Sequence, residues 1–435
     1  GGENFTPCAS CDELVCVKGA CCLSDNSCVD DVYEEECYDD LGGVQFFPDA
    51  ECADIVCQVN CRISCTDKGS LIIYSKVEVR WDAGGQLIQD TFIQLSNDYP
   101  GDVKVQFYFI NGDEPLPDHP GWNYVDNQIE LTGNQPVAWS AATGSGIVSP
   151  WSVLDPGDPP GRPANDGTGE YMLRGYIIGW AVNAEHQEIR WNHLSGSGTL
   201  VYYGGDHAAW EYNACTSKVI EAITDHGFPT GLTPGELSLD NLEYCPAPSQ
   251  LLMNFQAVGS SAYSTQTIGI NSNTDVTLHP VDVVLDPDVG ASPPVTKAHY
   301  DVWNENENKL SGAYRCITCW DQTLLSEYGI PNHFTLTALQ TDHGKARIDG
   351  LESQLCPGSD DLPLLGLVAR WLHSNQEFEG GLAASGVNMI GMGYENALIV
   401  FEEMDSEPPE APGGLEAPKN PFESADEFIE ELMQE

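Results

Sequence analysis

The sequence predicts a mainly β protein whose body is a large antiparallel β-sandwich, or two of them. Three observations predict this class. Runs that alternate apolar and polar residues recur between residues 71 and 402, eleven of the sixteen cysteines lie between Cys8 and Cys65, and the C-terminal stretch is rich in acids and prolines. We therefore divide the chain into a cysteine-rich module at 1–66, a first sandwich half or domain at 67–247, a second at 248–404, and a C-terminal arm at 405–435.

Residues 71–81 show the strand pattern most clearly. The apolar side chains are predicted on one face and Lys76, Glu78 and Arg80 on the other, as in a half-buried strand. Residues 86–95 and 103–109 follow after turns, so the three segments are predicted to form an antiparallel meander. The apolar residues of the first segment are Leu71, Ile73, Val77, Val79 and Trp81.

The later segments of the body follow the same reasoning. Residues 171–182 form a nearly continuous apolar run, which predicts a central strand covered on both faces. Residues 208–223 are predicted to form a short helix. Strands are expected at 251–258, 276–285, 296–304, 333–340, 363–372 and 396–402.

The cysteine-rich module is too short to bury a sufficient core, and cross-links are the usual remedy. Dense cysteines indicate an oxidising compartment, so we expect the protein outside the cell or at its surface. The chain opens Gly1-Gly2-Glu3 without a methionine or an apolar leader. Removal of a signal peptide explains that start, and an artificial start is the alternative.

We predict disulfides for all sixteen cysteines. Six of them form a unit that could close three internal bridges: Cys21, Cys22, Cys28, Cys37, Cys52 and Cys57. Five others remain in the module and five lie in the body, so full pairing requires at least one bridge from the module to the body or to another copy. These ten are Cys8, Cys11, Cys16, Cys61, Cys65, Cys215, Cys245, Cys316, Cys319 and Cys356. The Cys-x-x-Cys pairs at 8–11 and 316–319 leave structural zinc as an alternative.

Residues 16–57, which contain Gly19-Ala20-Cys21-Cys22-Leu23, resemble a cysteine-rich module found in secreted proteins of planctomycete-type bacteria. The resemblance covers under a tenth of the chain. It implies an extracellular location and carries no assigned activity.

The charge balance excludes some partners. With 67 acidic and 17 basic residues, the formal net charge is −50, which repels phosphate backbones and excludes nucleic acid. No run of eighteen apolar residues is present, which excludes a membrane-spanning helix. The acidity also opposes the packing of copies, and salt or divalent cations relieve it. A saline habitat and cation-assisted assembly both account for such a surface.

Few residues indicate a binding site. Calcium is the cofactor with candidate ligands, because turns concentrate carboxylates at Asp155, Asp158, Asp166 and Glu170. Asn4 begins a glycosylation triplet. The sequence contains no Gly-x-Ser-x-Gly, His-Glu-x-x-His or P-loop motif, so no catalytic residues are predicted and the protein is not expected to be an enzyme.

The arm combines twelve acids and five prolines between Glu402 and Glu435. Ser424 and Glu427 form a capping box before a short amphipathic helix whose apolar residues are Phe428, Ile429, Leu432 and Met433. These four are the predicted assembly contacts. The sequence thus predicts a secreted structural protein that assembles with its own copies into a filament or surface layer. The alternative is a secreted carbohydrate-binding or glycan-active sandwich protein.

Overall fold

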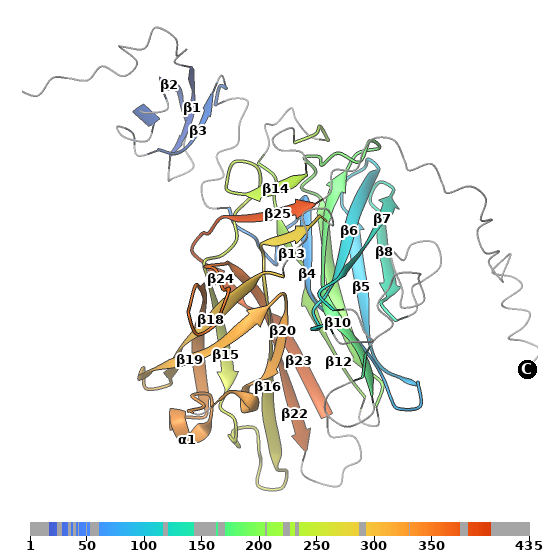
Figure 1. The fold of residues 1–435 in the computed structure, drawn as a ribbon, viewed down its shortest axis with the longest axis vertical. Helices are drawn as coiled ribbons and strands as arrows, with labels where there is room; N and C mark the ends of the chain where they lie inside the picture. Colours follow the sequence, from blue (N-terminus) through green and yellow to red (C-terminus); the bar gives the residue numbers. More distant parts are fainter. Residues whose placement is uncertain are drawn as a thin grey trace, which may run out of the picture. The chain divides into compact units, whose positions relative to one another are not determined.

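The computed structural model describes residues 17–23, 28–33, 36–37, 41, 43–48, 50–52, 61–115, 121–142, 162–163, 170–204, 207–220, 227–230, 235–286, 293–329, 331–374 and 382–401 (Figure 1). The described chain is mainly β, with many antiparallel strand pairs and very little helix. Residues 1–402 form one compact unit and residues 403–435 a second. The predicted class is confirmed at this level, and the predicted arm lies outside the described residues.

The N-terminal sheet has the order β2-β1-β3, with β1 at Lys18–Leu23, β2 at Cys28–Tyr33 and β3 at Gly43–Pro48. Its hydrophobic cluster is small. Two disulfides, Cys21–Cys37 and Cys28–Cys52, cross-link it, and Cys22 is disulfide-bonded as well. Cross-links therefore supplement a core that is too small to hold the sheet together on its own.

The large sheet contains ten strands, seven of them in the order β12-β11-β5-β4-β10-β6-β7 (Figure 1). β13 pairs with β4, β8 with β5 and β9 with β10. Their bounds are β4 Leu71–Trp81, β5 Leu87–Asn97, β6 Val103–Asn111, β7 Tyr124–Leu131, β8 Pro136–Ser140, β9 Arg162–Pro163, β10 Tyr171–Val182, β11 Leu194–Tyr202, β12 Ala208–Asn213 and β13 Cys215–Ser217.

The strands of this sheet are largely those predicted, but their order is not a meander. β10 lies between β4 and β6, so β6 has no contact along its edge with β5. The prediction that residues 171–182 form a central strand is confirmed, since nearly all of that strand is buried. An apolar strand of this kind buries the most surface when it pairs on both sides. β10 therefore lies next to β6, in the place that a meander would give to β5.

A β-bulge in β4 overturns the predicted assignment of its faces. Val77 pairs with Gly175 and Tyr74 with Ile177, so the register slips by one residue at Ser75–Lys76. Such a slip moves every later side chain to the other face. Lys76 and Glu78 consequently lie on the same side as Leu71 and Ile73, and both are buried rather than solvated.

Three further sheets complete the body. The small sheet has the order β14-β25-β17, the outer sheet β19-β18-β21-β15-β24, and the middle sheet β20-β16-β22-β23. Their bounds are β14 Glu236–Leu239, β15 Gln250–Gln256, β16 Ile270–Pro280, β17 Val283–Leu285, β18 Val295–Asn304, β19 Lys309–Thr318, β20 Asp321–Leu324, β21 His343–Leu351, β22 Leu364–Ser374, β23 Leu382–Asn388, β24 Ile390–Met392 and β25 Ala397–Phe401. Two short helical segments are η3 at Leu325–Glu327 and α1 at Leu336–Leu339.

Two predicted elements are wrong. In place of the helix expected at 208–223 lie two strands, β12, which pairs with β11, and β13, which pairs with β4. Trp210 and Tyr212 alternate with exposed residues along β12 and belong to the core. The strand expected at 333–340 contains α1 instead. Its N-cap is Thr335, whose side chain accepts a hydrogen bond from the Ala338 N–H.

The middle sheet is covered on both faces. Leu367 and Ala369 of β22 belong to the cluster that the large sheet forms. Val276 and Val368 belong to the cluster that the outer sheet forms. Because β-strand side chains alternate between faces, one strand serves two cores, and the body stacks three sheets.

Two disulfides join the N-terminal segment to the body: Cys61–Cys245 and Cys65–Cys215. The predicted bridge between module and body is thus confirmed, although its premise of full pairing fails. Cys319 is a free, buried thiol, and Cys316 bonds Cys356 instead. The reason is the strand geometry, since Cys316 is exposed on β19 while Cys319 faces the core. A zinc site at this Cys-x-x-Cys pair is excluded, because the Cys316 sulfur is already bonded.

Candidate functional site

A pocket that combines charged, amide and aromatic side chains lies where the large sheet meets the middle sheet. Its volume is about 390 Å³. The large sheet contributes residues from β4, β5 and β11, and the middle sheet contributes residues from β16, β20 and β22. The lining residues are Glu78, Arg80, Gln89, Tyr202, Asn273, Asp275, Gln322, Leu324, Trp371 and His373. We call this cavity the central pocket.

A buried charge cluster lies beside the central pocket. The Lys76 ammonium is 3.2 Å from Glu78 Oε2 and donates to Asp275 Oδ2 at 3.1 Å. Lys76 is 1% exposed, and the two carboxylates are nearly as buried. Gln322 Nε2 also donates to Asp275 Oδ2, at 2.6 Å. Such a cluster is costly to desolvate, so it is weak as a purely stabilising device and marks a candidate functional site.

The two carboxyls have opposite tendencies. Burial raises the pKa of Asp275, and the Lys76 ammonium only partly opposes that effect. Burial acts in the same direction on Glu78, but Lys76, Arg80 and Arg174 together hold the pKa of that carboxyl below its ordinary value. The pKa of Asp275 is therefore raised and that of Glu78 lowered, although both carboxyls contact the same Lys76 ammonium.

Unsatisfied hydrogen-bonding atoms lie in the same cluster. Among the described residues, Asp275 Oδ1 and Gln322 Oε1 are buried without a hydrogen-bond partner. Buried polar atoms are nearly always paired, so these two unpaired oxygens add to the free-energy cost of burying this cluster.

The local sequence pattern does not predict this site. Lys76, Glu78 and Arg80 were identified only as the polar face of a strand, and their partners come from β16, about two hundred residues later. One sequence signal was available, namely the polar run Asn271 to Asp275 ahead of the apolar end of the same strand. Ser272, Thr274 and Asp275 are buried in that half of the strand, and buried polar side chains of this kind indicate a special environment.

Of the predicted calcium ligands, only Glu170 lies among the described residues. Glu170 forms an ion pair with Arg80, beside the central pocket. Asp155, Asp158 and Asp166 lie outside the described residues, as do Asn4 and the predicted assembly contacts Phe428, Ile429, Leu432 and Met433.

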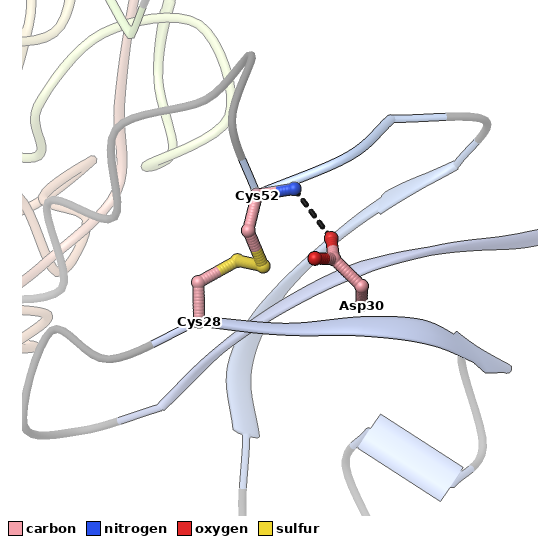
Figure 2. Close-up of side chains that lie close together, drawn as sticks. All are labelled: Cys28, Asp30 and Cys52. Carbon is pink, nitrogen blue, oxygen red and sulfur yellow. Dashed lines mark hydrogen bonds between the residues drawn. A yellow bond between two sulfur atoms is a disulfide. The ribbon is translucent and has the colours of Figure 1, made fainter.

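Within the described chain, one group of side chains has the composition and spacing of a metal site: Cys28, Asp30 and Cys52 (Figure 2). Both sulfurs are bonded to each other in a disulfide, and Asp30 Oδ1 accepts a hydrogen bond from the Cys52 N–H at 2.5 Å. A disulfide sulfur has no thiolate charge to offer a metal, so the group closes the N-terminal sheet and is no metal site.

Another buried carboxyl, that of Glu243, lies away from the central pocket. Glu243 is 1% exposed, and the Ser238 N–H donates to its Oε2 at 3.0 Å. Burial raises the pKa of Glu243 to about 7, and the nearby charges of Glu188 and Asp240 add to the effect. The folded state therefore resists ionisation of this group near neutral pH.

We expect Glu243 to make the protein more stable in mild acid. A carboxyl whose pKa is raised by folding stabilises the fold fully below its ordinary value of 4.5, and that contribution is lost as the pH rises through about 7. Glu243→Gln should therefore gain on the order of 2 kcal/mol over the wild type between pH 5 and 8, measured by urea unfolding. The exposed Glu185→Gln is the matched control. A difference that does not change with pH would contradict the assignment.

The described part of the chain contains no helix that is long and apolar enough to span a membrane. The five disulfides that join pairs of described cysteines indicate that the protein folds in an oxidising environment, as outside the cell. No protein-family model matches the chain, and no curated protein is similar enough to match it.

Proposed function

We propose that the protein binds a carbohydrate in the central pocket. The observation that carries this proposal is the lining itself, which places aromatic rings beside amides and carboxylates in one cavity. Sugar rings present apolar C–H faces that pack on aromatic rings, and hydroxyls at their edges that pair with amides and carboxylates. The pocket lining offers both kinds of partner.

Each part of the lining matches one feature of a sugar. Trp371 and Tyr202 supply ring faces, and both are only partly buried. Gln89, Asn273 and Gln322 supply amide donors and acceptors, and Glu78 and Asp275 supply carboxyl groups to the lining. The net charge of −50 disfavours anionic ligands by long-range repulsion, so the expected ligand is a neutral glycan.

Replacing Trp371 by alanine should weaken glycan binding at least about tenfold, because it removes the larger ring from the pocket. A panel of neutral oligosaccharides on an array would identify a bound glycan, and calorimetry with the full chain would give its affinity. Trp371→Phe should retain part of the affinity. Tyr314→Ala, which removes an exposed ring on β19 outside this pocket, should retain all of it. Equal affinities for Trp371→Ala and Tyr314→Ala would refute the proposed site.

Assembly into a filament or surface layer through the arm at 405–435 stays a prediction from the sequence. The acidic, proline-rich composition and the apolar stripe Phe428, Ile429, Leu432 and Met433 support it. We also propose that the body is one or two β-sandwiches. The stacked sheets, which share hydrophobic clusters on both faces of the middle sheet, support this architecture. Both hypotheses are compatible with a glycan site in the body.

A further inference from the structure

We propose that Lys76 and Asp275 become joined by an isopeptide bond, an amide between their two side chains, and that Glu78 catalyses its formation. Lys76 lies on β4 and Asp275 on β16. β4 pairs with β5, β10 and β13, whereas β16 pairs with β20 and β22, so the bond fastens the large sheet to the middle sheet. The bond goes beyond the proposed carbohydrate binding and is independent of it.

The two side chains that react are in contact in the fold. The Lys76 ammonium donates a hydrogen bond to Asp275 Oδ2 at 3.1 Å. A carbonyl bond is about 1.2 Å long, so the Lys76 nitrogen and the Asp275 carboxyl carbon are no more than about 4.3 Å apart. Reacting atoms in a near-attack arrangement are about 3–3.5 Å apart, so a movement of about 1 Å brings the nitrogen against the carbon.

The surroundings of the pair exclude bulk water. Lys76 is 1% exposed and Asp275 3% exposed. The Trp210 ring lies 6.0 Å from the Lys76 ammonium, and the Tyr212 hydroxyl donates to the Lys76 backbone carbonyl. Both aromatic side chains are buried. Water would hydrate the ammonium and keep it in its charged, unreactive form, whereas a desolvated lysine is an activated nucleophile.

Glu78 is the residue that moves the protons. Its Oε2 is 3.2 Å from the Lys76 ammonium. Although burial opposes ionisation, Lys76 and Arg80 help to hold the pKa of Glu78 below its ordinary value, so its carboxylate is present to accept a proton from the ammonium. Burial raises the pKa of Asp275, which favours the neutral acid. An amine attacks the carbon of a neutral acid more readily than that of a carboxylate.

The two oxygens of Asp275 have different surroundings, which assigns their roles. Gln322 Nε2 donates to Oδ2 at 2.6 Å. A donor in this place stabilises the negative charge that Oδ2 gains when the nitrogen attacks, as in an oxyanion hole. Oδ1 is buried without a hydrogen-bond partner in the described chain. Oδ1 is therefore the oxygen that leaves, because its departure breaks no hydrogen bond.

The reaction needs no co-reactant. Glu78 takes a proton from the Lys76 ammonium, and the neutral amine bonds the Asp275 carboxyl carbon while an electron pair of the C=O bond moves to Oδ2. Glu78 then gives its proton to the Oδ1 hydroxyl, the bond from carbon to Oδ1 breaks and one water leaves. The carbonyl forms again at Oδ2, and the nitrogen gives a second proton to Glu78. One ammonium, one carboxylate and one carboxylic acid thus become one amide, one carboxylic acid and one water.

Coupling removes the charges that make this cluster costly to bury, since the amide and the protonated Glu78 carry none. None of the five disulfides between described cysteines joins the large sheet to the middle sheet. The amide supplies that tie between two residues 199 positions apart. Its constraint on the unfolded chain adds to the contribution that the ion cluster makes before coupling. The Asp275 carbonyl remains in the lining of the central pocket.

Mass spectrometry of the reduced and denatured full chain tests the bond. The wild type should weigh one water less than its sequence requires, and its tryptic digest should contain a branched peptide in which Lys76 and Asp275 are joined. Lys76→Arg, which keeps the positive charge, and Asp275→Ala should each have the full mass of their sequence. A folded wild type with the full mass of its sequence would overturn the proposal.

Glu78→Gln separates catalysis from position. Glutamine keeps the length of the side chain and can still accept a hydrogen bond from Lys76, but it cannot take up a proton from the ammonium. The variant should therefore fold, as shown by circular dichroism, and keep the full mass of its sequence. Loss of one water from Glu78→Gln at the wild-type rate would overturn the catalytic role of Glu78.

Lys309 and Asp301 are a matched control within the same molecule. Lys309 Nζ is 2.8 Å from Asp301 Oδ1, which is closer than the contact of Lys76 with Asp275, but the Lys309 side chain is 45% exposed. Water keeps that ammonium charged, so this pair should stay uncoupled, and Asp301→Asn should still lose one water. A digest that joined Lys309 to Asp301 instead, or an Asp301→Asn variant with its full mass, would overturn the assignment of the bond to the buried pair.

Discussion

Replacing Lys76 by methionine is expected to lower the free energy of unfolding by about 3–5 kcal/mol. The change keeps an unbranched side chain that is one atom shorter, and it leaves Glu78 and Asp275 buried without their shared cation. Guanidinium unfolding of the full chain would measure the loss. Lys345→Met is the control, because Lys345 is exposed on β21 and its replacement should cost less than about 0.5 kcal/mol.

A second variant shows that the loss comes from the unpaired carboxylates. Replacing all three residues together, as Lys76→Met, Glu78→Leu and Asp275→Leu, removes every charge of the cluster. Buried ion clusters replaced by apolar residues are often neutral or more stable, so this triple variant should regain most of the lost stability. If the triple variant were as unstable as Lys76→Met, burial of the methionine itself would be the cause and the charge argument would fail.

Removing the Cys65–Cys215 bridge as Cys65→Ala and Cys215→Ala should cost about 3–4 kcal/mol. The two bridges are nested, since Cys61–Cys245 spans 184 residues and Cys65–Cys215 spans 150 within it. Once the outer bridge is closed, the inner bridge closes a loop of only about 35 residues, made of residues 61–65 and 215–245. The length of this loop determines how much the inner bridge stabilises the fold. Removal of both bridges should cost roughly twice as much, because the long loop then opens as well.

Urea unfolding with and without a reductant would measure this effect. In reducing buffer the wild type loses the same bridges, so the difference between wild type and variant should nearly vanish. A difference that persists after reduction would show that lost packing of Cys215, which is 1% exposed, outweighs the constraint on the unfolded chain.

Local pattern predicted much of the secondary structure. Residues 171–182 were identified as a central strand because an apolar run of that length has no solvated face. The strands predicted at 251–258, 296–304, 363–372 and 396–402 correspond to β15, β18, β22 and β25. The helix predicted at 208–223 is wrong, because Trp210 and Tyr212 are buried while Ala209, Glu211 and Asn213 are exposed, which is the period of a strand.

The central pocket could not be predicted because its parts meet only through long-range pairing. The bulge at Ser75 turns Lys76 and Glu78 inward, and no local signal marks a bulge within an alternating strand. The Trp320 indole donates to the Ser75 carbonyl at 3.0 Å, and His279 lies 3.1 Å from the Ser75 hydroxyl. Residues from the other half of the chain thus contact the bulge.

The sequence by itself determined the redox environment, the β class and the tether between the cysteine-rich module and the body. Those conclusions depend on composition, period and counting, which are properties of the chain alone. Tertiary structure alone decided the order of strands, the free state of Cys319 and the meeting of Glu78 with Asp275. The physical reason is that stacking three sheets selects among many pairings by total burial, and no short segment carries that information.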